Sequence, residues 1–85
     1  MIRSIRMLME GDYDVMALPV GATVTGAIID GPKVLILVSI DDNVTEKVGR
    51  GFLVIRDGTE PPAKSRLVAT SDEGSVYEIV GGASR

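Results

Sequence analysis

The chain has 85 residues and a net charge of −3, with 12 acidic and 9 basic residues mixed along its length. A chain of this size forms one domain and buries only about 60–65% of the surface that it exposes when unfolded, so its core is thin. It contains no cysteine and no histidine, which excludes disulfides, cysteine-ligated metals and most mechanisms that use a histidine base or a zinc ion.

The composition also sets expectations about partners. Apolar residues make up 45% of the sequence, more than so small a domain readily hides, so we expect a homo-oligomer. A compact monomer that covers all of its apolar residues is the alternative. The mixed charges argue against a surface for duplex nucleic acid. Arg3, Arg6 and Glu10 interrupt the first apolar residues, so we expect neither a signal peptide nor a membrane segment.

The first predicted strand covers residues 4–10. One face of this segment is apolar, with Ile5, Met7 and Met9, and the other carries Arg6, Leu8 and Glu10, which is typical of a half-buried strand. A helix is the alternative, because Arg, Met, Leu and Glu all favour helices. Gly11 and Asp12 end this segment, and the alternation that follows over residues 13–18 predicts a second short strand.

Turn residues frame the next two predicted strands. Residues 18–21, Leu-Pro-Val-Gly, predict a turn with Pro19 at its second position. Gly26 lies inside the following strand, over residues 22–29, and predicts a β-bulge there. The pair Asp30-Gly31 then predicts a tight hairpin that leads into the strand over residues 33–40.

The strand over residues 33–40 holds the densest run of branched apolar side chains in the sequence. Five consecutive apolar residues, 34–38, leave neither face suited to water, so we expect both faces to be covered, by this chain or by another copy. Residues 52–56 form a second strand of this kind, which we expect to lie beside the first. The predicted core residues are Leu35, Leu37, Phe52, Val54 and Ile79.

The remaining segments complete an all-β pattern. Residues 44–48 predict a loop or one helical turn capped by Asn43, and residues 57–64 predict the longest loop, which Pro61 and Pro62 keep out of any sheet. A last hairpin is expected over residues 66–80, followed by a flexible tail at residues 81–85. About six to seven short strands therefore predict a small antiparallel barrel or sandwich, with a single domain over residues 1–80.

Basic residues are concentrated around the strand over residues 52–55. With the amides of nearby glycines they form a candidate anion site for a phosphate or a small nucleotide. The residues of this candidate site are Arg50, Arg56, Thr59, Lys64 and Arg66. The alternative, and the commoner role of such residues, is that they are solvated charges that keep a hydrophobic strand from aggregating.

No catalytic constellation is predicted from the sequence. Asp41, Asp42 and Asn43 lack the spacing of a calcium-binding loop and predict a turn instead. The glycines at positions 49, 51 and 58 match neither a dinucleotide fingerprint nor a phosphate-binding loop. We therefore expect no metal site, no cofactor and no enzymatic activity.

Several short motifs follow one another in order along the chain. They are the Leu-Pro-Val-Gly-Ala turn at residues 18–22, the apolar run that ends near Asp41, Arg50-Gly51-Phe52, Gly58-Thr59, and the closing strand Val-Tyr-Glu-Ile-Val at residues 76–80. This order resembles a family of small uncharacterised bacteriophage proteins. The sequence differs from that family at Ile36, Glu78 and Glu60, where the family tends to have tryptophan, histidine and glycine. The resemblance implies a phage accessory protein that acts in the host cytoplasm, and it implies no reaction.

These observations lead to three hypotheses about function. The first is a non-enzymatic phage accessory protein, an oligomeric β module that binds a host or phage protein through a strand edge or an apolar face. The second is a small-ligand binder, for example a sponge that sequesters a nucleotide signal of host defence at a subunit interface near Arg50, Arg56 and Arg66. The further alternative is a minor protein of the virion, and an enzyme ranks behind the first two hypotheses.

Overall fold

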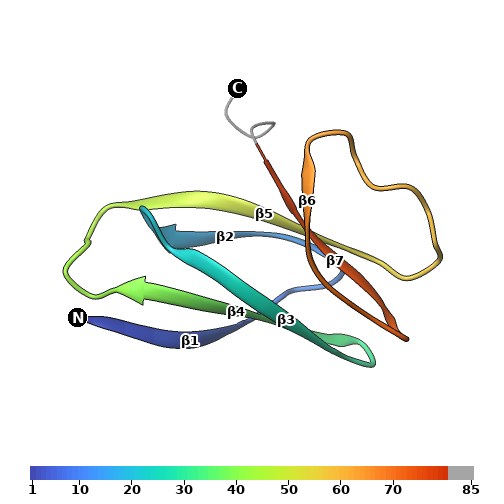
Figure 1. The fold of residues 1–85 in the computed structure, drawn as a ribbon, viewed down its shortest axis with the longest axis horizontal. Helices are drawn as coiled ribbons and strands as arrows, with labels where there is room; N and C mark the ends of the chain where they lie inside the picture. Colours follow the sequence, from blue (N-terminus) through green and yellow to red (C-terminus); the bar gives the residue numbers. More distant parts are fainter. Residues whose placement is uncertain (81–85) are drawn as a thin grey trace.

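The computed structural model describes residues 1–80, which form seven β-strands and no helix (Figure 1). A three-stranded antiparallel sheet has the order β1-β4-β3, where β1 is Ile2–Leu8, β4 is Lys33–Asp41 and β3 is Thr23–Asp30. A four-stranded antiparallel sheet has the order β2-β5-β7-β6, where β2 is Tyr13–Pro19, β5 is Lys47–Ile55, β7 is Gly74–Ile79 and β6 is Ser65–Ser71. The fold is therefore an all-β sandwich, as predicted, and within residues 1–80 the strands do not close into a barrel.

The local turn predictions are largely confirmed. Asp30 pairs with Lys33 across Gly31, whose φ of 60° suits glycine, so β3 and β4 form the predicted hairpin. The pairing of β3 with β4 shifts register between Val24 and Gly26, which is the predicted bulge. The last hairpin joins β6 to β7, and the longest loop separates β5 from β6.

Other local predictions need correction. The first segment is a strand, so the helical alternative is wrong. In the turn after β2, the amide of Ala22 donates to the carbonyl of Pro19 at 3.0 Å. Pro19 is therefore the first residue of this turn and not the second, and Gly21, with φ of 82°, takes the third position, which requires a positive φ. Residues 44–46 form a loop without a helical turn. The predicted flexible tail lies outside the described residues.

The two strands that are apolar on both faces do not lie side by side, which corrects that prediction. β4 pairs with β1 and β3, whereas β5 pairs with β2 and β7 in the opposite sheet. Each is the central or near-central strand of its own sheet. An apolar run identifies a strand that has neighbours on both sides, but it does not identify those neighbours, because they come from distant parts of the chain.

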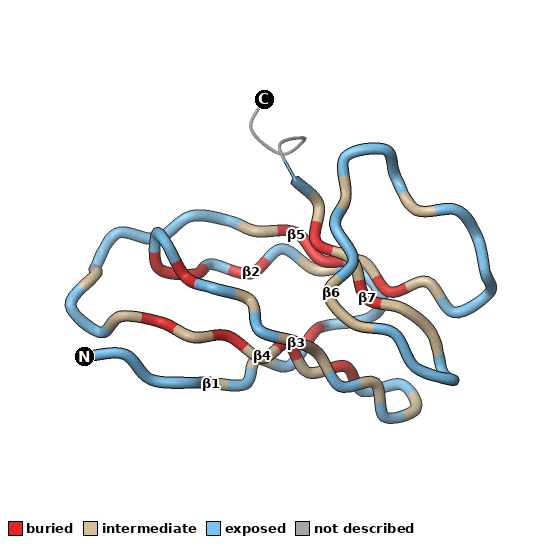
Figure 2. The backbone as a smooth tube through the Cα atoms, viewed as in Figure 1, coloured by how far each residue is buried: buried red, intermediate tan, exposed pale blue. Residues whose placement is uncertain are grey.

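The core lies between the sheets and uses alternate residues of β4 (Figure 2). The buried apolar residues are Met9, Met16, Leu18, Ala22, Val34, Ile36, Val38, Ile40, Phe52, Val54 and Val76. Phe52 and Val54 confirm the prediction. Leu35, Leu37 and Ile79 are only half-buried and point outward, so their assignment to the core is wrong. The four-stranded sheet covers one face of β4, and nothing within residues 1–80 covers the other face.

None of the described residues forms a helix that is long and apolar enough to span a membrane.

Candidate functional site

The inner face of the four-stranded sheet carries a buried carboxylate, Glu78, that two arginines hold. Strand pairing places Glu78 between Arg66 on β6 and Phe52 on β5. Arg50 Nε donates to Glu78 Oε2 at 2.6 Å, and Arg66 Nη2 donates to Glu78 Oε1 at 2.8 Å. Arg50 also donates through Nη1 to the carbonyl of Ala22, just before β3. This ion cluster therefore connects the two sheets of the sandwich.

The charge of Glu78 is stabilised by its partners. Burial is the largest influence on its pKa and raises it, but the hydrogen bonds and positive charges of Arg50 and Arg66 together outweigh burial. The pKa of Glu78 therefore lies below its ordinary value of 4.5, and the carboxylate is ionised at neutral pH. Within residues 1–80, no buried side-chain nitrogen or oxygen lacks a hydrogen-bond partner. We interpret the cluster as a structural element of the core.

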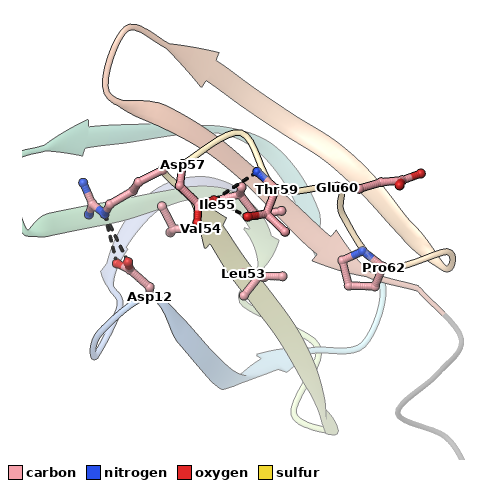
Figure 3. Close-up of a pocket in the computed structure, with 9 residues that line it drawn as sticks. Asp12, Leu53, Val54, Ile55, Asp57, Thr59, Glu60 and Pro62 are labelled. Atoms are coloured by element: carbon pink, nitrogen blue, oxygen red, sulfur yellow. Dashed lines mark hydrogen bonds and ion pairs between the residues drawn. The ribbon is translucent and has the colours of Figure 1, made fainter.

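A pocket of about 510 Å³ lies between β5 and the loop that follows it (Figure 3). Leu53, Ile55 and Pro62 provide apolar walls, and Leu53 and Ile55 belong to the outward side of β5. The full lining is Asp12, Leu53, Val54, Ile55, Arg56, Asp57, Thr59, Glu60 and Pro62. The pocket is therefore continuous with the outer surface of the four-stranded sheet.

The polar groups of this pocket give it an acidic rim. Arg56 pairs with Asp12 at 3.1 Å, which neutralises its charge. The hydroxyl and the amide of Thr59 both donate to Asp57, and these bonds hold the pKa of Asp57 below its usual range. Glu60 projects outward beyond Pro62, on the side opposite Asp12 (Figure 3). The charges of Arg56 and Asp12 cancel, so the net charge of the pocket comes from the carboxylates of Asp57 and Glu60.

The five residues of the candidate anion site do not come together. Arg50 and Arg66 meet at Glu78 between the sheets, whereas Arg56 and Thr59 line the pocket beside β5. Lys64 is exposed at the end of the loop and contributes to neither group. Each of the three arginines is already bonded to a carboxylate. An added phosphate would have to displace a carboxylate to reach any of these guanidinium groups.

The outer face of the four-stranded sheet contains a region without charged side chains, which extends over all four strands. We call this surface the uncharged face. It comprises the outward residues Tyr13, Val15, Ala17, Gly49, Gly51, Leu53, Ile55, Ser65, Leu67, Thr70, Ser75, Tyr77 and Ile79. Tyr13, Val15 and Leu67 are each more than half exposed, at 57%, 53% and 53%. Tyr13 and Val15 lie on one edge strand of this sheet and Leu67 on the other, and Leu53, Tyr77 and Ile79 between them are half-buried.

The outer face of the three-stranded sheet carries a smaller apolar surface, which we call the aliphatic face. It comprises Leu8, Ile28, Leu35 and Leu37. Strand pairing places Leu8, Leu35 and Ile28 in one row across the sheet, and Leu37 lies next to Gly26. Leu8 and Ile28 are 57% and 44% exposed. Two of these four residues were predicted to be in the core, because the sequence of β4 is apolar at odd and even positions alike.

Comparison with protein-family models, with curated proteins and with solved structures finds no match. Within the described part of the chain, no group of three or more Asp or Glu residues is arranged to hold a metal ion. The two outer faces and the pocket are therefore the features on which a function can be argued.

Proposed function

We propose that the chain is a non-enzymatic accessory protein of a bacteriophage, an oligomeric β module that binds a host or phage protein in the host cytoplasm. The observation that carries this proposal is the aliphatic face. Its side chains form a row across all three strands of a sheet whose outer side nothing within residues 1–80 covers. A soluble partner that covers this row would remove apolar surface from water, which is the main favourable term in protein association.

The surroundings of the aliphatic face fit a protein interface. Arg6 lies next to Leu37 across the pairing of β1 with β4, and Lys33 pairs with Asp30 at the end of the row. An apolar centre with a charged rim is the usual arrangement of a protein–protein interface. Full burial of a Leu or Ile side chain contributes about 1.5–3 kcal/mol, so covering the exposed half of Leu8 and of Ile28 contributes about 1 kcal/mol each.

The phage origin and the host cytoplasm are supported by the order of the sequence motifs. The Leu-Pro-Val-Gly-Ala segment includes the turn between β2 and β3, and the closing segment includes β7. The resemblance implies this biological setting and names no reaction.

We expect Ile28→Lys to abolish capture of the binding partner. Ile28 is 44% exposed, so the lysine can be accommodated in the fold, but it places a charge on the aliphatic face, directly beside Leu35. In quantitative pull-downs from a lysate of the host, a protein enriched by the wild-type chain should fall by about tenfold or more with the variant.

The matched control is Val20→Lys, because Val20 is 46% exposed in the turn between β2 and β3 and belongs to neither of the two outer faces. This variant should capture the partner as well as the wild-type chain does. Two results would count against the proposed function: the wild-type chain enriches no protein from the lysate, or Ile28→Lys captures the enriched protein as well as the wild-type chain does.

A further inference from the structure

We propose that a second copy of this chain covers the uncharged face, in a two-fold dimer in which β5 of one copy crosses over β5 of the other in the antiparallel direction. The inference rests on the proposed function for its oligomeric state, and it adds which face associates, with which symmetry and through which contacts. Three properties of the uncharged face lead to it: the sorting of its side chains by size, the charge at its two ends, and its area.

The side chains of the uncharged face are sorted by size into rows that run across the strands. The large row contains Tyr13, Leu53, Tyr77 and Leu67, the middle row contains Val15, Gly51, Ile79 and Ser65, and the small row contains Ala17 and Gly49. Both members of the small row are exposed. The face is therefore raised on one side of the middle row and low on the other.

A two-fold axis between two such sheets, at right angles to β5 and passing Gly51, places Tyr13 and Leu53 of each copy over the small row of the other. The small row has no member on β7 or β6, so Tyr77 and Leu67 take no part in this match. Residues equally distant from Gly51 in opposite directions then face each other, so Leu53 meets Gly49 of the second copy. On β2 the same operation places Tyr13 over Ala17 of the second copy. Two sheets pack about 10 Å apart when their side chains interdigitate, and large side chains of one sheet facing small ones of the other allow this. A parallel arrangement would set large against large.

The same operation matches charges at the two ends of β5. Lys47 points outward and is exposed at the start of β5. It lies four residues before Gly51, and Ile55 lies four residues after it, so the two-fold axis places Lys47 of one copy over Ile55 of the other. Lys47 of one copy therefore lies over the pocket of the other, where Asp57 and Glu60 form the acidic rim. The apolar pocket walls suit the stem of a lysine, and Glu60, which projects outward at the margin of the pocket, suits its ammonium group (Figure 3). A symmetric dimer contains two such contacts.

The area of the face sets the expected strength of the dimer. Four strands about 4.8 Å apart, with rows over about 20 Å of strand, give a footprint on the order of 400 Å² per copy before the loop is included. The smaller interfaces of specific complexes bury about 600 Å² per partner. The footprint is smaller than this before the loop and Lys47 add to it, so we expect a weak dimer, with a dissociation constant on the order of 10 µM.

Sedimentation equilibrium of the full chain, from about 1 to about 300 µM, tests the inference. The wild-type chain should change from monomer to dimer across this range. Lys47→Glu and Glu60→Lys each place like charges at both contacts, so each should raise the dissociation constant about tenfold. The chain that carries both substitutions restores opposite charges and should return to within about threefold of the wild-type value.

Lys33→Glu is the matched control, because Lys33 is exposed on the other sheet and the substitution changes the net charge equally. It should leave the dissociation constant unchanged. A wild-type chain that is monomeric throughout, a double variant that is not restored, or an equal effect of Lys33→Glu would overturn the inference. A monomeric chain that still loses its partner on Ile28→Lys would refute the dimer and the oligomeric state but not the proposed partner binding. A dimer with the expected charge pattern and no partner would refute only the partner binding.

Discussion

Replacing Glu78 by glutamine is expected to lower the free energy of unfolding by about 3 kcal/mol. The loss comes mainly from Arg50, whose side chain is only 19% exposed and keeps its charge after its anionic partner is gone. Removing one member of a buried ion pair costs more than the pair itself contributes, because the remaining charge is held away from water. Urea denaturation of the two proteins at pH 7 measures the difference.

Arg66→Gln separates this explanation from a general effect of removing charge. The Arg66 side chain is 62% exposed, so Glu78 retains Arg50 and little desolvated charge is left behind. We expect a loss of no more than about 1 kcal/mol. Equal losses for Glu78→Gln and Arg66→Gln would show that Arg50 is not the charge that matters.

The pH dependence of stability follows from the same cluster. The pKa of Glu78 is lowered in the folded state, so its contribution is complete above the unfolded pKa, near the ordinary value of 4.5, and is lost as the pH falls through the folded pKa. The stability difference between the wild-type chain and Glu78→Gln should therefore be largest at neutral pH and shrink in acid. A difference that stays constant below pH 4.5 would contradict the lowered pKa.

Ile36→Ala is expected to lower the free energy of unfolding by about 3–4 kcal/mol, and the neighbouring Leu37→Ala by only about 1 kcal/mol. Ile36 is fully buried between the sheets, whereas Leu37 is half-buried on the outer side of the same strand, beside Gly26. Truncating Ile36 leaves a cavity in a packed core, but truncating Leu37 changes a surface that water already reaches. Denaturant titrations at low protein concentration compare the two, and equal or reversed losses would contradict the assigned faces of β4.

Local rules predict the strands of this protein well but not their inward faces. In β4 the branched apolar side chains and the flanking turn residues identify a strand, and the continuous apolar run identifies a central one. Odd and even positions are equally apolar, so the choice between Val34, Ile36 and Val38 on one side and Leu35 and Leu37 on the other depends on the opposite sheet. That sheet is assembled from segments distant in the sequence, and periodicity carries no information about it.

β7 shows how a distant residue can reverse a local rule. A charged residue normally lies on the outside of a sheet, which is why Ile79 was predicted to be buried in place of Glu78. The structure buries Glu78, because Arg50 and Arg66 from two neighbouring strands bond to both of its oxygens. The sequence of β5 contains a signal for this buried ion pair. Gly49 and Gly51 alternate with Arg50 and Phe52, so Arg50 lies on the same face of the strand as the core residue Phe52.

The candidate anion site was predicted from residues that are close in the sequence, and folding separates them. Arg56 meets Asp12 from the start of the chain, whereas Arg50 meets Glu78 near its end. Neither pairing can be seen without the strand order. The uncharged face depends on strand order in the same way, because β3 and β4 of the other sheet separate β2 from β5, β6 and β7 along the chain.

Cross-linking through single introduced cysteines tests most directly whether the uncharged face joins two copies of the chain. The natural sequence has no cysteine, so Val15→Cys and Ile28→Cys each provide one thiol, on the uncharged face and on the aliphatic face. Val15 lies in the middle row, where it meets Val15 of the second copy. With a bismaleimide that spans no more than the distance between two packed sheets, we predict that purified Val15→Cys forms a covalent dimer at concentrations above the dissociation constant and that Ile28→Cys remains a single chain. A covalent dimer of Ile28→Cys together with a monomeric Val15→Cys would show that the chains associate through the other face.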